Sequence, residues 1–531
     1  MNPKSATPKD ASAVILLNDA GDKVLWARRS PQLAFLGGWH AFPGGKLEAA
    51  DALVKVDNCA DEEIGKFIVC AVREAFEEAG VLLVRNGEKL TRGQRASLHD
   101  DLISGRMTFA EILEHWNLQL DAADFIYTGF WTTPQFSPVR FKTRFFLAVC
   151  PSKQTPYAAV SELEDVEFIQ PNDALNQWRA SKVLISPPVL LTLKTLNELS
   201  SRWSGDTAPN GKNLISNQSL PIKNATSRRL CAETLFENSR AADGNIRYIE
   251  LNPRVICFPL RTETLPPATH MNCFVVGRKK FIVVDAAAKN EAEQNALRDL
   301  IDSFVERGFL CRAIITTHSH PDHFGGETAL QKHLSDKFDL QIPLVAHEAT
   351  AKNLAGKVEF QRLIADGEIF DLEDESGANF QLQTLHTPGH ARGLLAFYDE
   401  EFGFLLPGDN VIGSSSVVIA PPEGSMKDYL ISLERLKNLP NLKFLCGSHG
   451  AAIFDAKTKI ESYIAHRLER EKQIIEAMRD GAKTAREIVD RVYVDLKSEL
   501  IRLAEKSVEA HLIKIREEIS HEQTRKGTKV F

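Results

Sequence analysis

Residues 318–323, His-Ser-His-Pro-Asp-His, constrain this chain more than any other part of its sequence. Three imidazoles and one carboxylate fall within these six residues, directly after the apolar residues 313–315, which are typical of a strand. Imidazole and carboxylate are the ligands that a hydrolytic Zn²⁺ or Fe ion takes in proteins. The cluster therefore predicts a metal site at the end of a strand.

Three more candidate ligands follow at wide intervals. His390 ends the stretch His-Thr-Pro-Gly-His, Asp409 ends Leu-Leu-Pro-Gly-Asp, and His449 lies in Cys-Gly-Ser-His-Gly. Each follows or ends an apolar strand-like run, from which a loop can direct a side chain towards a common centre. Strands and helices alternate over about residues 250–455, a pattern typical of a layered α/β domain.

These motifs resemble the metallo-β-lactamase superfamily over about residues 250–455. His-x-His-x-Asp-His, the later His, the Gly-Asp and the final Ser-His-Gly occur in the order and spacing of that family. The resemblance implies an αββα sandwich with two metal ions, Zn or Fe, at one edge. It also implies the ligands: His318, His320 and His390 for one metal, Asp322, His323 and His449 for the other, and Asp409 as the bridge.

A binuclear centre of this kind lowers the pKa of a bridging water towards neutrality and so supplies hydroxide as the nucleophile. The same metals stabilise the developing oxyanion, so no protein nucleophile is required. We therefore expect Asp322 and Asp409 to serve catalysis as well as metal binding.

The C-terminal part is predicted to be helical. Over residues 456–520, apolar residues recur at helical spacing, as at Ile474, Ile475 and Met478. From His466 onward the chain resembles the winged-helix-like segment of one branch of the superfamily. That branch includes thioesterase-like proteins and a single-strand endoribonuclease.

A second signature lies in residues 73–81, Arg-Glu-Ala-Phe-Glu-Glu-Ala-Gly-Val. Glu74, Glu77 and Glu78 stand at positions i, i+3 and i+4, which places three carboxylates on one face of a helix. Their mutual repulsion is relieved by a cation, and carboxylate oxygens suit Mg²⁺ or Mn²⁺, which also bind diphosphate. Together with Phe-Pro-Gly-Gly at 42–45, the stretch resembles the core of the Nudix box.

The Nudix-like box is interrupted. Asp51 stands where the family has a glutamate, and 21 residues separate it from Arg73, about 14 more than in the family pattern. An interrupted box of this kind resembles the coenzyme A diphosphatase-like branch. The resemblance implies attack of water on a phosphorus of a linked nucleoside diphosphate. The three glutamates would bind the metal, with Glu77 and Glu78 catalytic, and Arg73 would orient the helix and loop.

The 531 residues are thus expected to form a multidomain α/β and α+β protein. The predicted parts are a Nudix α/β/α sandwich over residues 10–200, a linker over 201–245, a metallo-β-lactamase αββα sandwich over 246–455 and a small helical winged-helix-like domain over 456–531. The linker is predicted because Ser, Asn, Gly, Pro and Lys dominate residues 200–225, a composition that buries little apolar surface.

The composition limits which kinds of partner and which cellular compartment we expect for this protein. A net charge of −7 does not favour nucleic acid or an anionic membrane as a partner. The eight cysteines are scattered without a Cys-x-x-Cys pair, which fits a reducing cytoplasm. No apolar run is long enough for a signal core or a membrane span. We predict a cytoplasmic protein that acts on small molecules and leave its oligomeric state open.

The leading hypothesis is a bifunctional metal-dependent hydrolase. The Nudix half would act on a nucleoside-diphosphate-linked substrate, such as a CoA derivative, and the other half on a thioester or related ester; an acyl-CoA contains both bonds. One alternative is RNA processing, with single-strand endoribonuclease activity in the lactamase-like half. Another makes the Nudix half a non-catalytic nucleotide sensor, against which the retention of Glu74, Glu77 and Glu78 argues.

Overall fold

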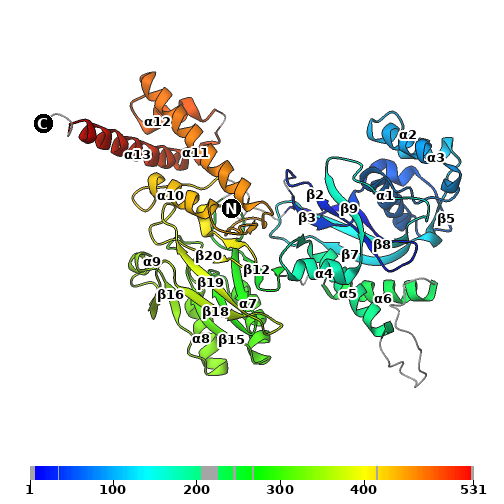
Figure 1. The fold of residues 1–531 in the computed structure, drawn as a ribbon, viewed down its shortest axis with the longest axis horizontal. Helices are drawn as coiled ribbons and strands as arrows, with labels where there is room; N and C mark the ends of the chain where they lie inside the picture. The colour runs from blue at the N-terminus through cyan, green and yellow to red at the C-terminus, as the bar shows by residue number, and fades with distance from the viewer. Residues whose placement is uncertain are drawn as a thin grey trace. The chain divides into compact units, whose positions relative to one another are not determined.

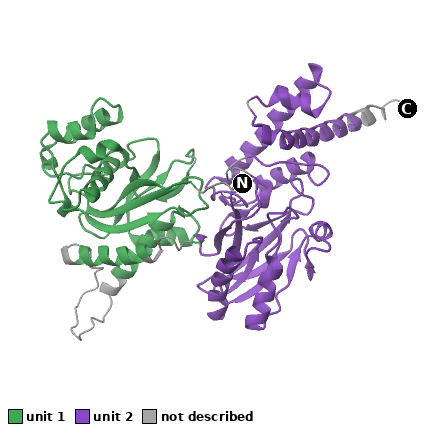
Figure 2. Ribbon diagram, turned by 180° about the vertical axis from the view of Figure 1, so that it is seen from behind, with its two compact units in different colours: residues 1–247 green, residues 248–531 purple. Residues whose placement is uncertain are grey.

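The computed structural model describes residues 6–33, 35–204, 225–242, 247–265, 268–413, 416–494 and 496–527. The chain divides into two compact units, residues 1–247 and 248–531, which are coloured separately in Figure 2. Each unit has its own sheet and its own hydrophobic cores.

The first unit is built on a mixed eight-stranded sheet. A parallel ladder joins β1 to β8 along the whole of β1, and β2 pairs with β1 in the antiparallel sense. The strands of this sheet are β1 (Lys9–Leu17), β2 (Val24–Arg29), β3 (Trp39–Ala41), β4 (Gly44–Lys46), β7 (Ile126–Thr132), β8 (Phe141–Val149), β9 (Leu163–Ile169) and β10 (Leu184–Ile185). A separate ladder joins β5 (Val56–Asp57) to β6 (Leu120–Asp121).

Helices cover both faces of this sheet, because alternate residues of a strand point to opposite faces. Val14 and Leu16 of β1 belong to the core beneath α1 (Glu62–Ala79), whereas Ile15 belongs to the core beneath α5 (Pro187–Ser204). The unit is therefore an α/β/α sandwich, as predicted (Figure 1). The other helices between α1 and α5 are α2 (Arg92–Ile103), α3 (Phe109–His115) and α4 (Pro171–Arg179).

Helix α1, which carries the three glutamates, has defined ends. At its start, the side chain of Asp61 accepts a hydrogen bond from the backbone N–H of Glu63 at 2.9 Å, which caps the first turn. At its end, Gly80 adopts a left-handed conformation with φ of 65°, which glycine takes without strain. The helix therefore ends at Ala79, one residue after Glu78, and its apolar face lies on the sheet.

Residues Ala225–Ala242 form α6, inside the segment predicted as a linker. Cys231 and Leu235 of this helix are buried in the same core as α5, and the Ser239 hydroxyl donates to the carbonyl of Phe130 at 2.5 Å. The polar composition behind the linker prediction covers residues 200–225 only, and apolar residues recur at helical spacing beyond it. The remainder of the predicted linker, 205–224 and 243–246, lies outside the described residues.

The second unit contains twelve paired strands. One set comprises β11 (Ile249–Asn252), β12 (Val255–Leu260), β13 (Met271–Gly277), β14 (Lys280–Val284), β15 (Leu310–Ile315), β16 (Leu344–Ala346) and β17 (Arg362–Leu363). The other comprises β18 (Ile369–Glu373), β19 (Asn379–His386), β20 (Leu395–Asp399), β21 (Phe404–Leu406) and β22 (Phe444–Leu445). A single pairing, Lys280 with Glu373, joins β14 to β18.

Each set of strands is covered by its own helices. Helices α7 (Glu291–Glu306) and α8 (Glu327–Phe338) pack with residues of β12 to β15. Helices α10 (Met426–Lys437) and α11 (Ala456–Arg479) pack with residues of β19 to β22. The arrangement is the predicted αββα sandwich (Figure 1). A short helix, α9 (Glu348–Asn353), follows β16.

The chain ends in the predicted helices. Helix α11 continues past the sandwich and shares a small core with α12 (Ala485–Val492) and α13 (Ile501–Gly527). None of the described helices is both long and apolar enough to cross a membrane. All eight cysteines are unpaired.

Candidate metal centres

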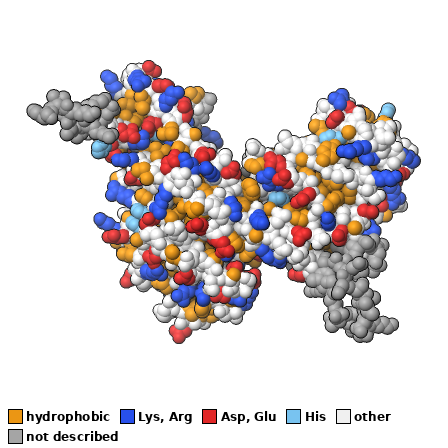
Figure 3. Space-filling view, viewed as in Figure 1, with side chains coloured by type: hydrophobic (Ala, Val, Ile, Leu, Met, Phe, Trp, Pro, Cys, Tyr) orange, Lys and Arg blue, Asp and Glu red, His pale blue; other side chains and the backbone are white. Residues whose placement is uncertain are grey.

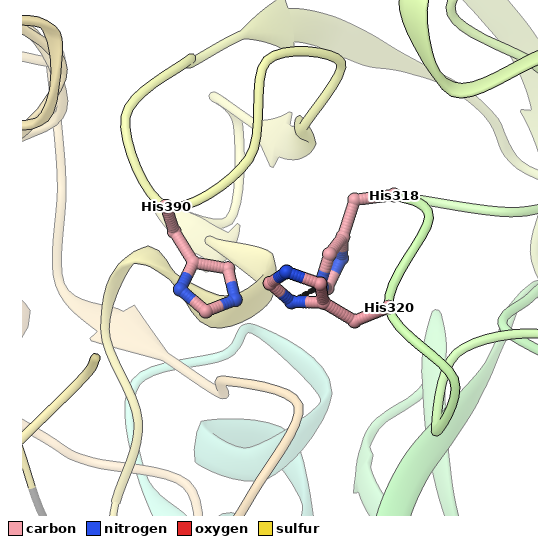
Figure 4. A group of neighbouring side chains, drawn as sticks. All are labelled: His318, His320 and His390. Carbon is pink, nitrogen blue, oxygen red and sulfur yellow. Dashed lines mark hydrogen bonds between the residues drawn. The ribbon is translucent and has the colours of Figure 1, made fainter. Parts of the chain in front are cut away.

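The seven residues predicted as ligands in the second unit lie on loops that follow β15, β19, β21 and β22. Figure 4 shows three of them, His318, His320 and His390, with their rings facing one another. All seven fall into three overlapping groups, and within each group the ligand atoms lie within 4.8 Å of one another. The groups are His318, His320 and His390; His318, His323 and Asp409; and Asp322, His323 and His449.

Asp409 lies between the groups. Its Oδ1 is 3.5 Å from Nε2 of His323, and its Oδ2 is 3.6 Å from Nε2 of both His390 and His449. His449 Nε2 is also 3.4 Å from Oδ2 of Asp322. One carboxylate thus faces ligands of both predicted metals.

Several polar atoms at this centre are buried and have no hydrogen-bond partner among the described residues. They are Nε2 of His323, Nε2 of His390 and Oδ1 of Asp409. An unsatisfied buried polar atom costs about 1–3 kcal/mol, and a coordinated cation would supply the missing partner. The imidazole and carboxylate donors therefore fit a divalent metal centre.

Hydrogen bonds behind the rings fix which nitrogen faces the centre. Nδ1 of His390 donates to the carbonyl of Val418 at 2.9 Å, and Nδ1 of His449 donates to the carbonyl of His270 at 3.0 Å. Since a carbonyl oxygen only accepts, Nδ1 carries a hydrogen in both rings, and Nε2 is the nitrogen left to face a metal. This is the orientation that a metal-ligating histidine needs.

Asp285, which the sequence analysis did not single out, contacts the candidate ligands. Its Oδ2 lies 2.8 Å from Nδ1 of His323 and accepts from the Thr317 hydroxyl at 2.8 Å, while Oδ1 accepts from the Thr317 N–H at 2.7 Å. Thr317 Oγ1 is in turn 3.0 Å from Nδ1 of His318. The available signal was an aspartate directly after the apolar end of β14, but its partners become neighbours only because β14 and β15 run in parallel.

The pKa values of two of these histidines are shifted in opposite directions. Burial, with a smaller contribution from His320, lowers the pKa of His390 to about 3. Burial opposes protonation of His449 as well, but Asp409 and Asp322 outweigh it and raise the pKa of His449 to about 10. A metal ion that binds His449 must therefore displace a proton.

A cavity of about 580 Å³ adjoins the loop of His390. Glu423 lines this cavity and also reaches His320 electrostatically: burial lowers the pKa of His320, and Glu423 acts in the opposite direction. Helix α13 contributes Ala510 and Ile513 to the wall. The charged lining is balanced and consists of Arg392, Lys427, Lys514, Glu423, Asp428 and Glu517.

In the first unit, Arg73 is buried and holds the predicted Nudix helix to its loop. Its Nε lies 2.8 Å from Oδ1 of Asp51, and its Nη2 lies 3.1 Å from Oδ2 of the same residue. Nη2 also donates to the carbonyl of Lys46 at 3.0 Å, and Nη1 donates to Glu74 at 2.9 Å. Asp51, although shorter than the glutamate of the family pattern, therefore reaches Arg73 across the interruption of the box. The guanidinium of Arg73 is occupied by these contacts inside the protein.

The three glutamates have different surroundings. Glu78 is buried and accepts from the backbone N–H of Gly44 at 2.9 Å, and Gly45 packs so closely on Glu74 that an added Cβ would lie 2.4 Å from Oε1. Glu77 is more exposed and lies 3.3 Å from Arg73. Burial raises the pKa of Glu78 to about 8 and that of Glu74 to about 7.

Among the described residues, these three carboxylates do not converge within 4.8 Å as the ligand groups of the second unit do. Glu74 and Glu78 lie beside Gly45 and Gly44 of β4 instead, and Glu77 lies near Arg73.

Comparisons with known proteins agree with both halves. Residues 267–449 match the family model of the metallo-beta-lactamase superfamily, residues 54–196 match the NUDT19 Nudix domain, and residues 484–519 match the beta-lactamase associated winged helix domain.

Two relatives each match one half. An atrochrysone carboxyl ACP thioesterase of Aspergillus novofumigatus is 27% identical over 288 residues, which are 52% of this chain and 82% of that protein. A putative nudix hydrolase 7 of Caenorhabditis elegans is 27% identical over 193 residues, which are 36% of this chain and 61% of that protein. Among solved structures, a metallo-beta-lactamase family protein from Thermus thermophilus is 26% identical, covers 50% of this chain and 95% of its own, and has a TM-score of 0.40.

The fold, the ligand groups and these matches define a metal-dependent hydrolase. The chain joins a Nudix domain to a metallo-β-lactamase domain and its associated winged helix, as the sequence predicted, and the matching Nudix model is of the NUDT19 type.

Proposed function

We propose that this protein is a bifunctional hydrolase. Its metallo-β-lactamase half hydrolyses a thioester or related ester at a binuclear centre of Zn or Fe ions. Its Nudix half cleaves a nucleoside-diphosphate-linked substrate, such as a CoA derivative, with Mg²⁺ or Mn²⁺. An acyl-CoA, which contains both a thioester and a diphosphate, is the simplest compound on which both halves could act.

The single observation that carries the proposal is the overlap of the three ligand groups. Seven donors exceed the four ligands that one tetrahedral ion takes, and His318, His323 and Asp409 link the groups to one another. We infer that these donors would hold two ions and that Asp409, which lies near His323, His390 and His449, would serve both. Bound metals supply a water of lowered pKa and stabilise negative charge on the attacked group.

The chain's own residues prepare this chemistry. The Val418 and His270 carbonyls turn the Nε2 atoms of His390 and His449 towards the centre, and Asp285 does the same for His323. Asp322 and Asp409 provide the negative charge that two divalent cations require.

A thioester of moderate size fits the surroundings better than RNA. The adjoining cavity has a volume typical of small-molecule sites, and its three basic and three acidic side chains balance. A single RNA strand needs a positively charged groove along its backbone. On the face shown in Figure 3, acidic and basic side chains are interspersed in both units. The thioesterase among the relatives points to the same class of bond.

For the Nudix half, the proposal rests on the three glutamates of α1: Glu74 and Glu78 contact β4, and Glu77 lies near Arg73. Burial raises the pKa values of Glu74 and Glu78, so a bound cation would stabilise their charged forms. Arg73, buried against Asp51, fixes the helix relative to the loop.

Two point variants of the full chain test the proposal. With metals restored, the wild type should hydrolyse acyl-CoA thioesters and diphosphates from a substrate panel. Asp409→Asn should abolish only thioester hydrolysis, and Glu78→Gln only diphosphate hydrolysis, because the two residues lie in different units.

Other results would select an alternative. Cleavage of single-stranded RNA that is lost in Asp409→Asn would favour an RNA-processing enzyme. Nucleotide binding without turnover would make the Nudix half a sensor. No activity of the wild type on any thioester or diphosphate would refute the bifunctional proposal.

A further inference from the structure

The segment between Asp409 and α10 orients one of the predicted ligands. Its Val418 carbonyl accepts from Nδ1 of His390 at 2.9 Å, as described above. Displacement of this carbonyl would free the ring of His390 to rotate and would misdirect its Nε2. The position of the Val418 peptide is therefore a condition for the site that includes His390.

Helix α11 holds this segment at two carbonyls. The Tyr463 hydroxyl donates to the carbonyl of Ile412 at 2.9 Å. Nη2 of Arg467, one helical turn further on, donates to the carbonyl of Val417. The carbonyls of Val417 and Val418 belong to consecutive peptides, so Arg467 binds one and His390 binds the next.

The guanidinium of Arg467 is buried, so its desolvation must be offset by the contacts that it makes inside the protein. Arg467 is 3% exposed, and its guanidinium forms no ion pair with a carboxylate of the described residues. Its compensation is the Val417 carbonyl and the ring of Tyr429, whose centroid is 5.5 Å away. A buried guanidinium that is paired only in this way is an expensive means of packing, but it provides a fixed donor for a carbonyl outside the described strands.

The same helix reaches the other side of the centre. Gly413, next to the Ile412 that Tyr463 holds, donates its N–H to the carbonyl of His449 at 2.7 Å. Tyr463 also packs in the core that contains Val411 and Ile419. The loop of the centre is thus bound to α11 through polar and apolar contacts together.

We propose that Tyr463 and Arg467 of α11 are positioning residues of the metal centre, which hold residues 411–413 and 416–418 so that the Val418 carbonyl orients His390. The inference rests on the proposed function only in requiring that the centre binds metal. It assigns to the helix that leads into the C-terminal domain a part in forming the site.

Metal affinity of the full-length protein tests this inference without reliance on a substrate. The metal-free protein is titrated with Zn²⁺ against a chromophoric chelator and, separately, with Co²⁺ to record the absorption of the bound ion. Arg467→Met should weaken the binding of one of the two ions about 10- to 100-fold, the effect typical of losing an orienting partner. The affinity for the second ion should stay nearly unchanged. Tyr463→Phe, which removes only a hydroxyl, should weaken the binding of the same ion less.

Two further variants separate positioning from folding. Arg467→Lys restores a donor for the Val417 carbonyl and should recover part of the lost affinity. Arg479→Met makes the same change at an exposed arginine of α11 and should bind both ions like the wild type. Circular dichroism and thermal unfolding record whether each variant is folded.

Equal metal affinity in Arg467→Met, Tyr463→Phe and wild type would overturn the inference. An equal loss of affinity for both ions, in parallel with a fall in thermal stability, would also overturn it, because that result indicates a structural role alone. A wild-type protein that binds no divalent metal would instead refute the proposed function.

Discussion

Replacing Glu78 by glutamine should stabilise the first unit at pH 8 while it abolishes diphosphate hydrolysis. Glu78 is 6% exposed, and burial, together with the nearby Glu74, raises its pKa from 4.5 to about 8. Glutamine has the same shape, carries no charge, and keeps an oxygen that can accept the N–H of Gly44. It therefore resembles the protonated form, which the fold prefers.

The sign and size of the effect follow from the two pKa values. Between pH 4.5 and about 8, the unfolded chain has released the Glu78 proton while the folded protein retains it. Wild-type stability therefore falls as the pH rises through this window and is level above it. At about 1.4 kcal/mol per pH unit, the loss reaches about 3–5 kcal/mol at pH 8 and stays below about 1 kcal/mol at pH 5.

The sequence offers a selective assay for this prediction. All six tryptophans lie in the first unit, at positions 26, 39, 116, 131, 178 and 203. Tryptophan fluorescence during urea unfolding of the full chain, with a chelator present, therefore reports on that unit alone. The free energy of unfolding of Glu78→Gln minus that of the wild type should increase from about pH 5 to about pH 8.

A control and a second ligand condition sharpen the test. Glu62→Gln makes the same change at an exposed position in the first turn of α1 and should show no such increase. Added Mg²⁺ should stabilise the wild type more than Glu78→Gln, because the cation offsets the buried charge. A stability difference that does not change between the two pH values would refute the reasoning.

Three further predictions concern single contacts. Asp51→Asn removes one partner of a buried ion pair and should cost the first unit about 3–5 kcal/mol, measured by the same fluorescence. Gly389→Ala should lower the thermal stability of the second unit and weaken metal binding, because its Cβ would lie 2.3 Å from Cα of Tyr429 at a φ of +142°. Asp285→Asn keeps the left-handed backbone, with φ of 58°, that asparagine tolerates. It removes the charge beside His323 and should lower Zn²⁺ affinity about 10- to 100-fold, with an unchanged circular dichroism spectrum.

Local patterns in the sequence predicted most of the architecture. The spacing of Glu74, Glu77 and Glu78 indicated the helix that carries them, and the alternation of strands and helices indicated the layered second unit. These features are readable because they depend on neighbours within about one helical turn or one strand. Composition failed where it was extended too far: α6 lies in a segment predicted as a linker, and its burial depends on a sheet surface more than ninety residues away in sequence, as at Phe130.

The candidate metal centre shows the same division. The residue types predicted a metal site, because chemistry restricts which side chains bind a hydrolytic metal, and the family resemblance implied its seven ligands. Their orientation is a tertiary property. It comes from the carbonyls of His270 and Val418 and from Asp285, whose sequence positions carry no sign of this role. A backbone carbonyl is the same at every residue, so only the folded chain decides which one meets a histidine.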